Sequence, residues 1–354
     1  MPKTETTLPG NLEWVNWLAG LSKQYGIPVA VVAVFLAFAI VGFLWWKWPD
    51  IEKRPGVKPF VKWVWSFFKQ GASSDQAHDE SKTTLVLRAG LLMNEANKLS
   101  TQIQYMEAVY KYEQAWQIWS VKLKDRPELD ANRATLLMNW ASTLDALGQY
   151  PEAEHKYEQA WQIWGVKLKD RPELDADRAT LLMNWAITLR ALGQVPDAEH
   201  KYEQAWQIRG VKLKDRPELD ADRATLLMNW AGTLYALGQV PEAERKYEQA
   251  WQIWGVKLKD RPELDANRAT LLMNWGITLR ALGQYPDAEH KYEQAWQIRG
   301  VKLKDRPELD ADRATLLMNW AGTLRALGQD AEAARKEEQA RALRARATQP
   351  PLQN

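Results

Sequence analysis

The chain has 354 residues and no cysteine, and 47 basic against 45 acidic residues give it a formal net charge of +2 at pH 7. The lack of cysteine excludes disulfides, thiol chemistry and zinc sites with cysteine ligands. The near balance of charge argues against nucleic-acid binding, which depends on a clustered basic excess. We therefore expect no nucleic-acid partner.

A long apolar run near the N-terminus predicts a membrane span. Residues 27–46 read IPVAVVAVFLAFAIVGFLWW and carry no charge. A helix of about 20 such residues spans about 30 Å, the thickness of a bilayer core. A cleaved signal peptide is the alternative, but the run is too long and no small-residue cleavage site follows it. We predict an N-terminal segment over residues 1–26 and a transmembrane helix over residues 27–48.

Positive charges on the two sides of this run predict its orientation. Those before it are Lys3 and Lys23, and those soon after it are Lys47, Lys53, Arg54, Lys58 and Lys62. Positive charge collects on the cytoplasmic side of membrane spans. We therefore expect a single-pass protein whose C-terminal repeat domain is cytoplasmic, and the inverted topology is the alternative.

The segment that follows has an amphipathic pattern. Over residues 49–70 it contains Phe60, Trp63 and Phe67 on one helical face, with lysines toward the polar side. Such a segment is expected to lie in the lipid headgroup layer, so residues 27–70 are the predicted lipid contact. A buried helix of the soluble part is the alternative. Residues 71–84 show no apolar periodicity and predict a flexible linker.

The rest of the chain is an internal repeat of 45 residues. The motif YEQAW places tryptophan at 116, 161, 206, 251 and 296, and LLMNW recurs with the same step. Degenerate copies stand at both ends, with Glu95 in a tryptophan position of the first copy and Glu337 and Arg341 in aromatic positions of the last. Polar end copies are expected of a solenoid, whose terminal units must cover a stacking face. We predict six units over residues 85–347 and a tail over residues 348–354.

Each unit is expected to form two helices. In the second unit the first helix covers about residues 131–147 and ends at Gly148, which suits the position after a helix. The second helix begins at Pro151, whose fixed φ fits a first helical turn. The chain breaks again at Arg171-Pro172, and Asp175 is placed to cap the next helix.

This unit resembles the tetratricopeptide repeat. The matching positions are Leu137, Trp140, Ala141, Leu144, Gly148, Tyr150, Ala153, Tyr157 and Ala160. The common unit has about 34 residues, and the longer unit here is similar to those of kinesin light chains and many bacterial scaffold proteins. The resemblance implies an all-α fold, a right-handed superhelical solenoid of six helix-turn-helix hairpins. It also implies that the small alanines let the two helices approach closely.

Two positions on the first helix vary most between copies. They are Ser142, Ile187, Gly232, Ile277 and Gly322, and Asp145, Arg190, Tyr235, Arg280 and Arg325. Helical spacing puts both positions on one face, opposite the face that packs the hairpin. The resemblance implies that this face lines the concave groove in which peptides bind. The variation then reflects either tuning to a ligand or drift after recent duplication. At a third variable position, near the ends of the second helices, Trp119, Trp164 and Trp254 alternate with Arg209 and Arg299, in either the core or the groove edge.

An unvarying asparagine lies on the same face in every copy. Its members are Asn94, Asn139, Asn184, Asn229, Asn274 and Asn319. An amide both donates and accepts, so it can pair with the backbone of an extended peptide; bonding to neighbouring helices is the alternative. The arginines suit an acidic or phosphorylated peptide or a free carboxylate, unless each pairs with a neighbouring acid. The predicted groove residues are Asn139, Asn184, Asn229, Asn274, Asn319, Arg190, Tyr235, Arg280 and Arg325.

An enzyme is disfavoured. Three of the four histidines (His155, His200 and His290) are copies of one repeated position, and no phosphate loop, nucleophile elbow or metal-ligand spacing is present. We expect no catalytic residue, no metal and no cofactor. The sequence predicts a membrane-anchored scaffold or adaptor that binds protein partners through extended acidic peptide segments. The alternatives are a self-associating structural membrane protein and a periplasmic chaperone-like protein.

Overall fold

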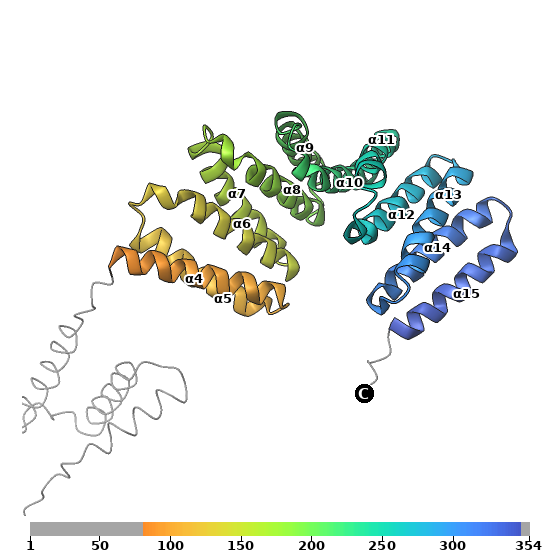
Figure 1. Cartoon of the computed structure of the whole chain (residues 1–354), viewed down its shortest axis with the longest axis horizontal. Coiled ribbons are helices and arrows are strands. Elements are labelled where there is room, and N and C mark those ends of the chain that lie inside the picture. The colour runs from red at the N-terminus through yellow and green to blue at the C-terminus, as the bar shows by residue number, and fades with distance from the viewer. Residues whose placement is uncertain (1–80, 348–354) are drawn as a thin grey trace, which may run out of the picture. The chain divides into compact units, whose positions relative to one another are not determined.

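The computed structural model describes residues 81–347, which form helices and turns without a strand (Figure 1). The predicted N-terminal segment, transmembrane helix (27–48), interfacial segment (49–70), most of the linker (71–84) and the tail (348–354) lie outside the described residues. Among the helices that are described, none has the length and apolar character to cross a membrane. The chain divides after Glu80, and the repeats belong to the second unit.

The described residues form six helical hairpins, as the sequence predicts. The first helix of each hairpin is called here its A helix and the second its B helix. In chain order the A and B helices are α4 (Lys82–Thr101) with α5 (Tyr105–Gln117), α6 (Asp130–Ala146) with α7 (Tyr150–Trp161), α8 (Asp175–Ala191) with α9 (Val195–Trp206), α10 (Asp220–Ala236) with α11 (Val240–Trp251), α12 (Asp265–Ala281) with α13 (Tyr285–Trp296), and α14 (Asp310–Ala326) with α15 (Asp330–Ala347).

The turn inside each hairpin depends on a left-handed residue. Gly148 has φ 75°, its N–H donates to the Asp145 carbonyl at 2.9 Å, and the Gln149 N–H donates to the Leu144 carbonyl at 2.9 Å. These two bonds satisfy the last carbonyls of α6, and glycine adopts this φ without steric cost. Hairpins 3 to 6 repeat the arrangement. Hairpin 1 differs, because Ile103 has φ 64° in the same position.

Small and aromatic side chains fill the space between the two helices, as expected. In hairpin 2, Ala141, Ala153 and Tyr157 have no exposed surface and Trp140 is 7% exposed. The Lys156 ammonium covers the Trp140 ring, 4.0 Å from its centroid, and hairpins 3 to 6 carry the same pair. In hairpin 1, where glutamate replaces the tryptophan, the same lysine position forms an ion pair, Lys111 to Glu95 at 3.1 Å.

A π-helical turn follows the B helix of hairpins 1 to 5. These turns are Ile118–Lys122, Gln162–Lys167, Gln207–Lys212, Gln252–Lys257 and Gln297–Lys302, and a 3-10 turn (Pro172–Leu174 before α8) leads into each later A helix. Trp161 packs against Gly165 so closely that a Cβ there would lie 2.3 Å from the indole ring. The alternating tryptophan and arginine position lies in these turns and is buried: Trp164 is 1% and Arg209 1% exposed. The position therefore belongs to the core and not to a groove edge.

Adjacent hairpins are joined by a bridge of a buried arginine, a buried aspartate and a largely exposed lysine. Arg178 donates to the Trp164 carbonyl of hairpin 2 at 2.8 Å and to Asp175 at 2.5 Å, and it also bonds the Leu168 carbonyl. The other Asp175 oxygen pairs with Lys212 at 2.5 Å. The predicted capping role of Asp175 is therefore wrong. Asp175 is the first residue of α8, no side chain caps this helix, and the carboxylate is engaged by two cations.

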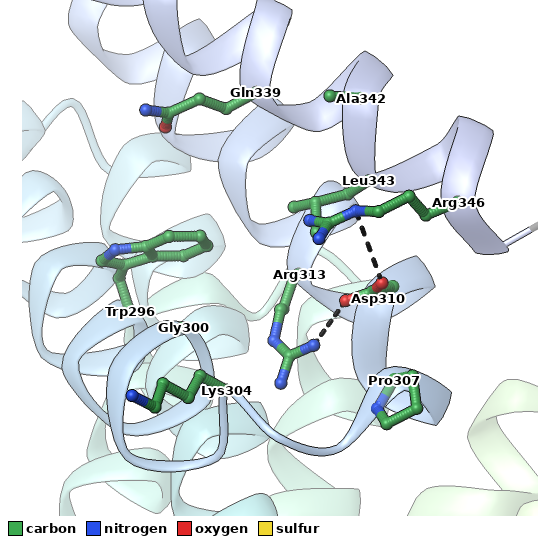
Figure 2. A pocket seen from close by; sticks show the side chains of 10 residues that line it. All are labelled: Trp296, Gly300, Lys304, Pro307, Asp310, Arg313, Gln339, Ala342, Leu343 and Arg346. Atoms are coloured by element: carbon green, nitrogen blue, oxygen red, sulfur yellow. Dashed lines mark hydrogen bonds and ion pairs between the residues drawn. The ribbon is translucent and has the colours of Figure 1, made fainter.

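The last hairpin modifies this bridge. Figure 2 shows Arg313 and Arg346 both directed at Asp310, with Arg346 Nε 3.9 Å from the carboxylate. Arg346 stands in the place that a lysine of the π-helical turn holds in the preceding hairpins. The hollow around these side chains lies between the last π-helical turn and α15. Its acid is already paired, so this hollow is not a strong candidate for ligand binding.

The hairpins follow one another in a curved row. Each B helix packs on the next A helix, and successive A helices also contact each other, whereas no successive pair of B helices is equally close. The row therefore curves toward its A helices. In Figure 1, α8 and α10 lie on the inner side of this curve and α9 and α11 on the outer side. The inner face consists of the A-helix surface that carries the variable positions.

Candidate functional site

The inner face is partly open to solvent, in contrast to the opposite side of the same helices. In α8, Leu182, Trp185 and Leu189 are buried, whereas Asn184 and Ile187 are half-buried and Arg190 is exposed. The other A helices of hairpins 2 to 6 repeat this division, except that Asp145 and Arg280, in the position of Arg190, are half-buried. The division agrees with the two helical faces predicted from the sequence. The predicted groove residues thus all lie on one continuous side of the row.

The unvarying asparagines of hairpins 2 to 6 fall into two groups, those that bond to the preceding hairpin and those that do not. The Asn139 amide donates to Asn97 at 3.1 Å and the Asn184 amide to Ser142 at 3.5 Å, each across to the preceding hairpin. Within residues 81–347 the side chains of Asn229, Asn274 and Asn319 make no hydrogen bond. These three amides lack a partner because the preceding hairpin has isoleucine or glycine at the position that Asn97 and Ser142 occupy in hairpins 1 and 2. Bonding between helices therefore explains two asparagines, and three half-buried amides remain available.

Hairpin 2 holds its acid in an internal network. Asp145 accepts hydrogen bonds from Thr188 of the next hairpin at 2.8 Å and from the Tyr157 hydroxyl at 3.0 Å, and that hydroxyl also bonds Ser142 at 2.9 Å. Burial raises the pKa of Asp145, and the two hydroxyl donors partly offset this by lowering it. The variable pair of hairpin 2 is thus used within the solenoid. Its acid would repel an acidic ligand at this end of the face.

Arg190 and Arg280 have no acidic partner among the described residues. Each extends toward the following hairpin, where glycine leaves room for it. A Cβ on Gly232 would lie 3.1 Å from the Arg190 Nη1, and a Cβ on Gly322 would lie 2.7 Å from the Arg280 Nη1. The two variable positions are therefore coupled across hairpins, since the arginine of one hairpin needs the glycine of the next.

The charge of each of these arginines acts on a buried tyrosine, Arg190 on Tyr202 and Arg280 on Tyr292. Tyr202 and Tyr292 have no exposed surface, and their hydroxyl groups lack a hydrogen-bond partner among the described residues. Burial raises the pKa of Tyr202 to about 12, although the charge of Arg190 and the nearby Thr233 hydroxyl act to lower it. In hairpin 2 the equivalent hydroxyl, that of Tyr157, forms hydrogen bonds with Ser142 and Asp145. Replacing this pair by isoleucine and arginine leaves the tyrosine hydroxyl without a partner.

The remaining predicted residues behave differently. Arg325 pairs with Glu337 of its own hairpin at 2.5 Å, so the expectation that an arginine pairs with a neighbouring acid applies to this residue. Tyr235 is 36% exposed and makes no hydrogen bond among the described residues. The face therefore presents two unpaired arginines, one open tyrosine and three free amides. The sequence could not show that these arginines meet a glycine about 42 positions later and a tyrosine about 12 positions later, because each contact joins two different helices.

No other cluster in the described part of the chain has the character of a chemical site. Within residues 81–347 no three histidine, aspartate or glutamate side chains converge as metal ligands would. His155, His200 and His290 are about two-thirds exposed, at 63%, 63% and 62% of their side-chain surface. They lie on the solvated side of the B helices α7, α9 and α13.

Comparison with known proteins agrees with this architecture. The family model of the tetratricopeptide repeat matches residues 222–299, which cover most of hairpins 4 and 5. No curated protein sequence matches the chain. A putative kinesin light chain of Podosopora anserina with nearly identical TPR-like repeats has a similar structure, with 26% identity, 62% of this chain and 99% of that chain covered, and a TM-score of 0.50. A substituted form of that protein gives 27% identity, 61% and 96% coverage and a TM-score of 0.51.

A structure of lower identity shows the same fold. BtubC (BKLC) from P. vanneervenii is 18% identical, with 78% of this chain and 96% of that chain covered and a TM-score of 0.50. The family model thus matches hairpins 4 and 5, and the fold of the described hairpins is similar to that of proteins with tetratricopeptide-like repeats. Such repeats generally serve as non-enzymatic scaffolds for protein–protein interaction.

Proposed function

We propose that this scaffold binds extended, acidic segments of protein partners along the inner face of its A helices, over hairpins 3 to 6. The observation that carries the proposal is the pair of unpaired arginines, Arg190 and Arg280, beside free asparagine amides. A guanidinium binds a carboxylate through two parallel hydrogen bonds. The amides can hold the peptide backbone whatever its side chains. Asp145 disfavours an acidic segment at hairpin 2.

We propose further that the scaffold is tethered to a membrane. The support is the sequence of residues 27–48 and the positive charges after it, which favour a cytoplasmic repeat domain. Protease treatment of intact cells, followed by detection of the repeats, tests this. Cleavage of the repeats without lysis would contradict the cytoplasmic placement, and recovery of the chain in a soluble fraction would contradict the tether.

Selection from a random peptide library tests the binding proposal. The immobilised chain should enrich sequences rich in aspartate and glutamate, and a variant with Asn229, Asn274 and Asn319 changed to alanine should enrich them poorly. Its matched control changes Gln207, Gln252 and Gln297 to alanine, because these three amides are exposed and lie in the π-helical turns, outside the A helices. If neither protein enriches acidic peptides, or if the control loses as much as the variant, the proposal fails.

A further inference from the structure

Side chains at the variable positions of the inner face recur in every second hairpin from hairpin 3 to hairpin 6, whereas the sequence motifs recur in every hairpin. Hairpins 3 and 5 carry the same pair, Ile187 with Arg190 and Ile277 with Arg280, and hairpins 4 and 6 follow each with a glycine. We propose that the face holds two equivalent acid-binding subsites two hairpins apart, and that its ligand carries two acidic side chains about six residues apart. This inference rests on the proposed function.

Each subsite is built across two neighbouring hairpins. In the first, Ile187 and Arg190 come from α8, and Asn229 and Gly232 come from α10. The Arg190 guanidinium lies over Gly232, and its charge acts on the buried Tyr202 hydroxyl, which has no hydrogen-bond partner among the described residues. The second subsite repeats these positions in α12 and α14, with Arg280 over Gly322 and its charge acting on the buried Tyr292. Each subsite therefore combines an unpaired cation, a free amide and a half-buried apolar contact.

The intervening junctions lack a free cation. Between hairpins 2 and 3, Asp145 is held by Thr188 and Ser142 bonds Asn184, so both variable side chains are engaged. Between hairpins 4 and 5, Tyr235 stands in the arginine position. After Gly322, Arg325 is paired with Glu337. Within the described residues, positive charge is thus available on this face at alternate junctions.

The distance between the subsites sets the ligand spacing. α8 contacts α10 and α10 contacts α12 directly, and packed helices lie about 8–10 Å apart. Two steps therefore separate the subsites by about 16–20 Å. An extended chain advances about 3.3 Å per residue, so this distance corresponds to five or six residues. Side chains alternate along an extended chain, and only an even spacing directs both acids to the same side. Six is the spacing that meets both conditions.

The two glycines offer a test that leaves the charge in place. An alanine at 232 or 322 would put a Cβ within 3.1 or 2.7 Å of the arginine terminus and move the guanidinium away. The atom it meets is the far end of a flexible side chain, so the fold should tolerate the change. Gly90→Ala is the matched control, because nothing lies within 4 Å of a Cβ at that position of α4.

Fluorescence anisotropy with the full chain measures the spacing preference. The probes are labelled peptides of about 15 residues, otherwise neutral, with no glutamate, one glutamate, or two glutamates separated by three, six or nine positions. We expect the six-residue spacing to bind about tenfold tighter than the other two, because only this peptide engages both subsites at once. Gly232→Ala with Gly322→Ala should remove the preference, and Gly90→Ala should keep it.

Two results would overturn the inference and can be told apart. If all peptides with two glutamates bind alike, or if the glycine variant keeps the preference, the two subsites are refuted, while the proposed binding of acidic segments stands. If no acidic peptide binds better than the neutral one, the proposed function itself fails.

Discussion

Replacing Asp175 by alanine should destabilise the junction between hairpins 2 and 3 by about 4 kcal/mol. The Asp175 and Arg178 side chains are 3% and 5% exposed, and their bond of 2.5 Å is closed from solvent. Without the carboxylate, Arg178 keeps its bonds to the Trp164 and Leu168 carbonyls, but its charge is left buried without compensation. Removal of one partner from a buried ion pair costs about 3–5 kcal/mol.

The same bridge provides a matched control. Lys212 pairs with the other Asp175 oxygen, but 57% of its side chain is exposed. Exposed ion pairs contribute at most about 1 kcal/mol, so Lys212→Ala should cost no more than that. Urea unfolding followed by circular dichroism measures both changes. If Asp175→Ala costs less than about 1.5 kcal/mol, or no more than Lys212→Ala, then the buried bridge does not stabilise the junction as argued.

Three further changes test particular contacts. Gly165→Ala should lower the free energy of unfolding by about 2 kcal/mol, because the new methyl group would overlap the Trp161 ring. Its control, Gly90→Ala, lies in open space within α4 and should stabilise the protein by up to about 1 kcal/mol. Thermal melts measure both changes, and equal effects would refute the packing argument. Ile103→Gly should stabilise by about 1 kcal/mol, because it relieves a left-handed backbone, and an unchanged urea midpoint would contradict this. Burial raises the pKa of Asp145, so this carboxyl group binds a proton more tightly in the folded state than in the unfolded state. The free energy of unfolding should therefore fall as the pH rises through the range just above the ordinary aspartate pKa. Asp145→Asn should flatten that slope, and an unchanged pH profile would show that the group does not titrate as inferred.

The hairpins could be predicted because each local signal agrees with the repeat. Gly148 follows one helix, Pro151 lies in the first turn of the next, and the 45-residue step repeats both from hairpin 2 to hairpin 5. The π-helical turns and the role of Asp175 could not be predicted in the same way. The aspartate stands where a capping residue is expected, and only the approach of Arg178 and Lys212 in space shows that it forms ion pairs instead.

The candidate face was predictable, whereas the state of each residue on it was not. Helical spacing alone places the asparagines and arginines on one side of the A helices. Whether a side chain is free depends on its neighbour in the adjacent hairpin or helix: Ser142 engages Asn184, and Glu337 engages Arg325. The coupling of Arg190 to Gly232 depends on how two successive A helices align, which is a property of the stack and not of one copy.

The central claim is that an acidic segment binds at positioned arginines of the inner face. Its most direct test compares the affinity of one peptide with two glutamates for three forms of the chain: the unchanged protein, Arg190→Ala with Arg280→Ala, and Arg216→Ala with Arg306→Ala. The control pair is also two hairpins apart and removes the same charge, but each member pairs with an exposed glutamate beside a 3-10 turn, at 2.7 and 2.6 Å. We expect about a tenfold or greater loss for the first variant and less than about twofold for the second. Equal losses would show unspecific attraction to net charge, and no loss in either would show that the inner arginines do not bind the ligand.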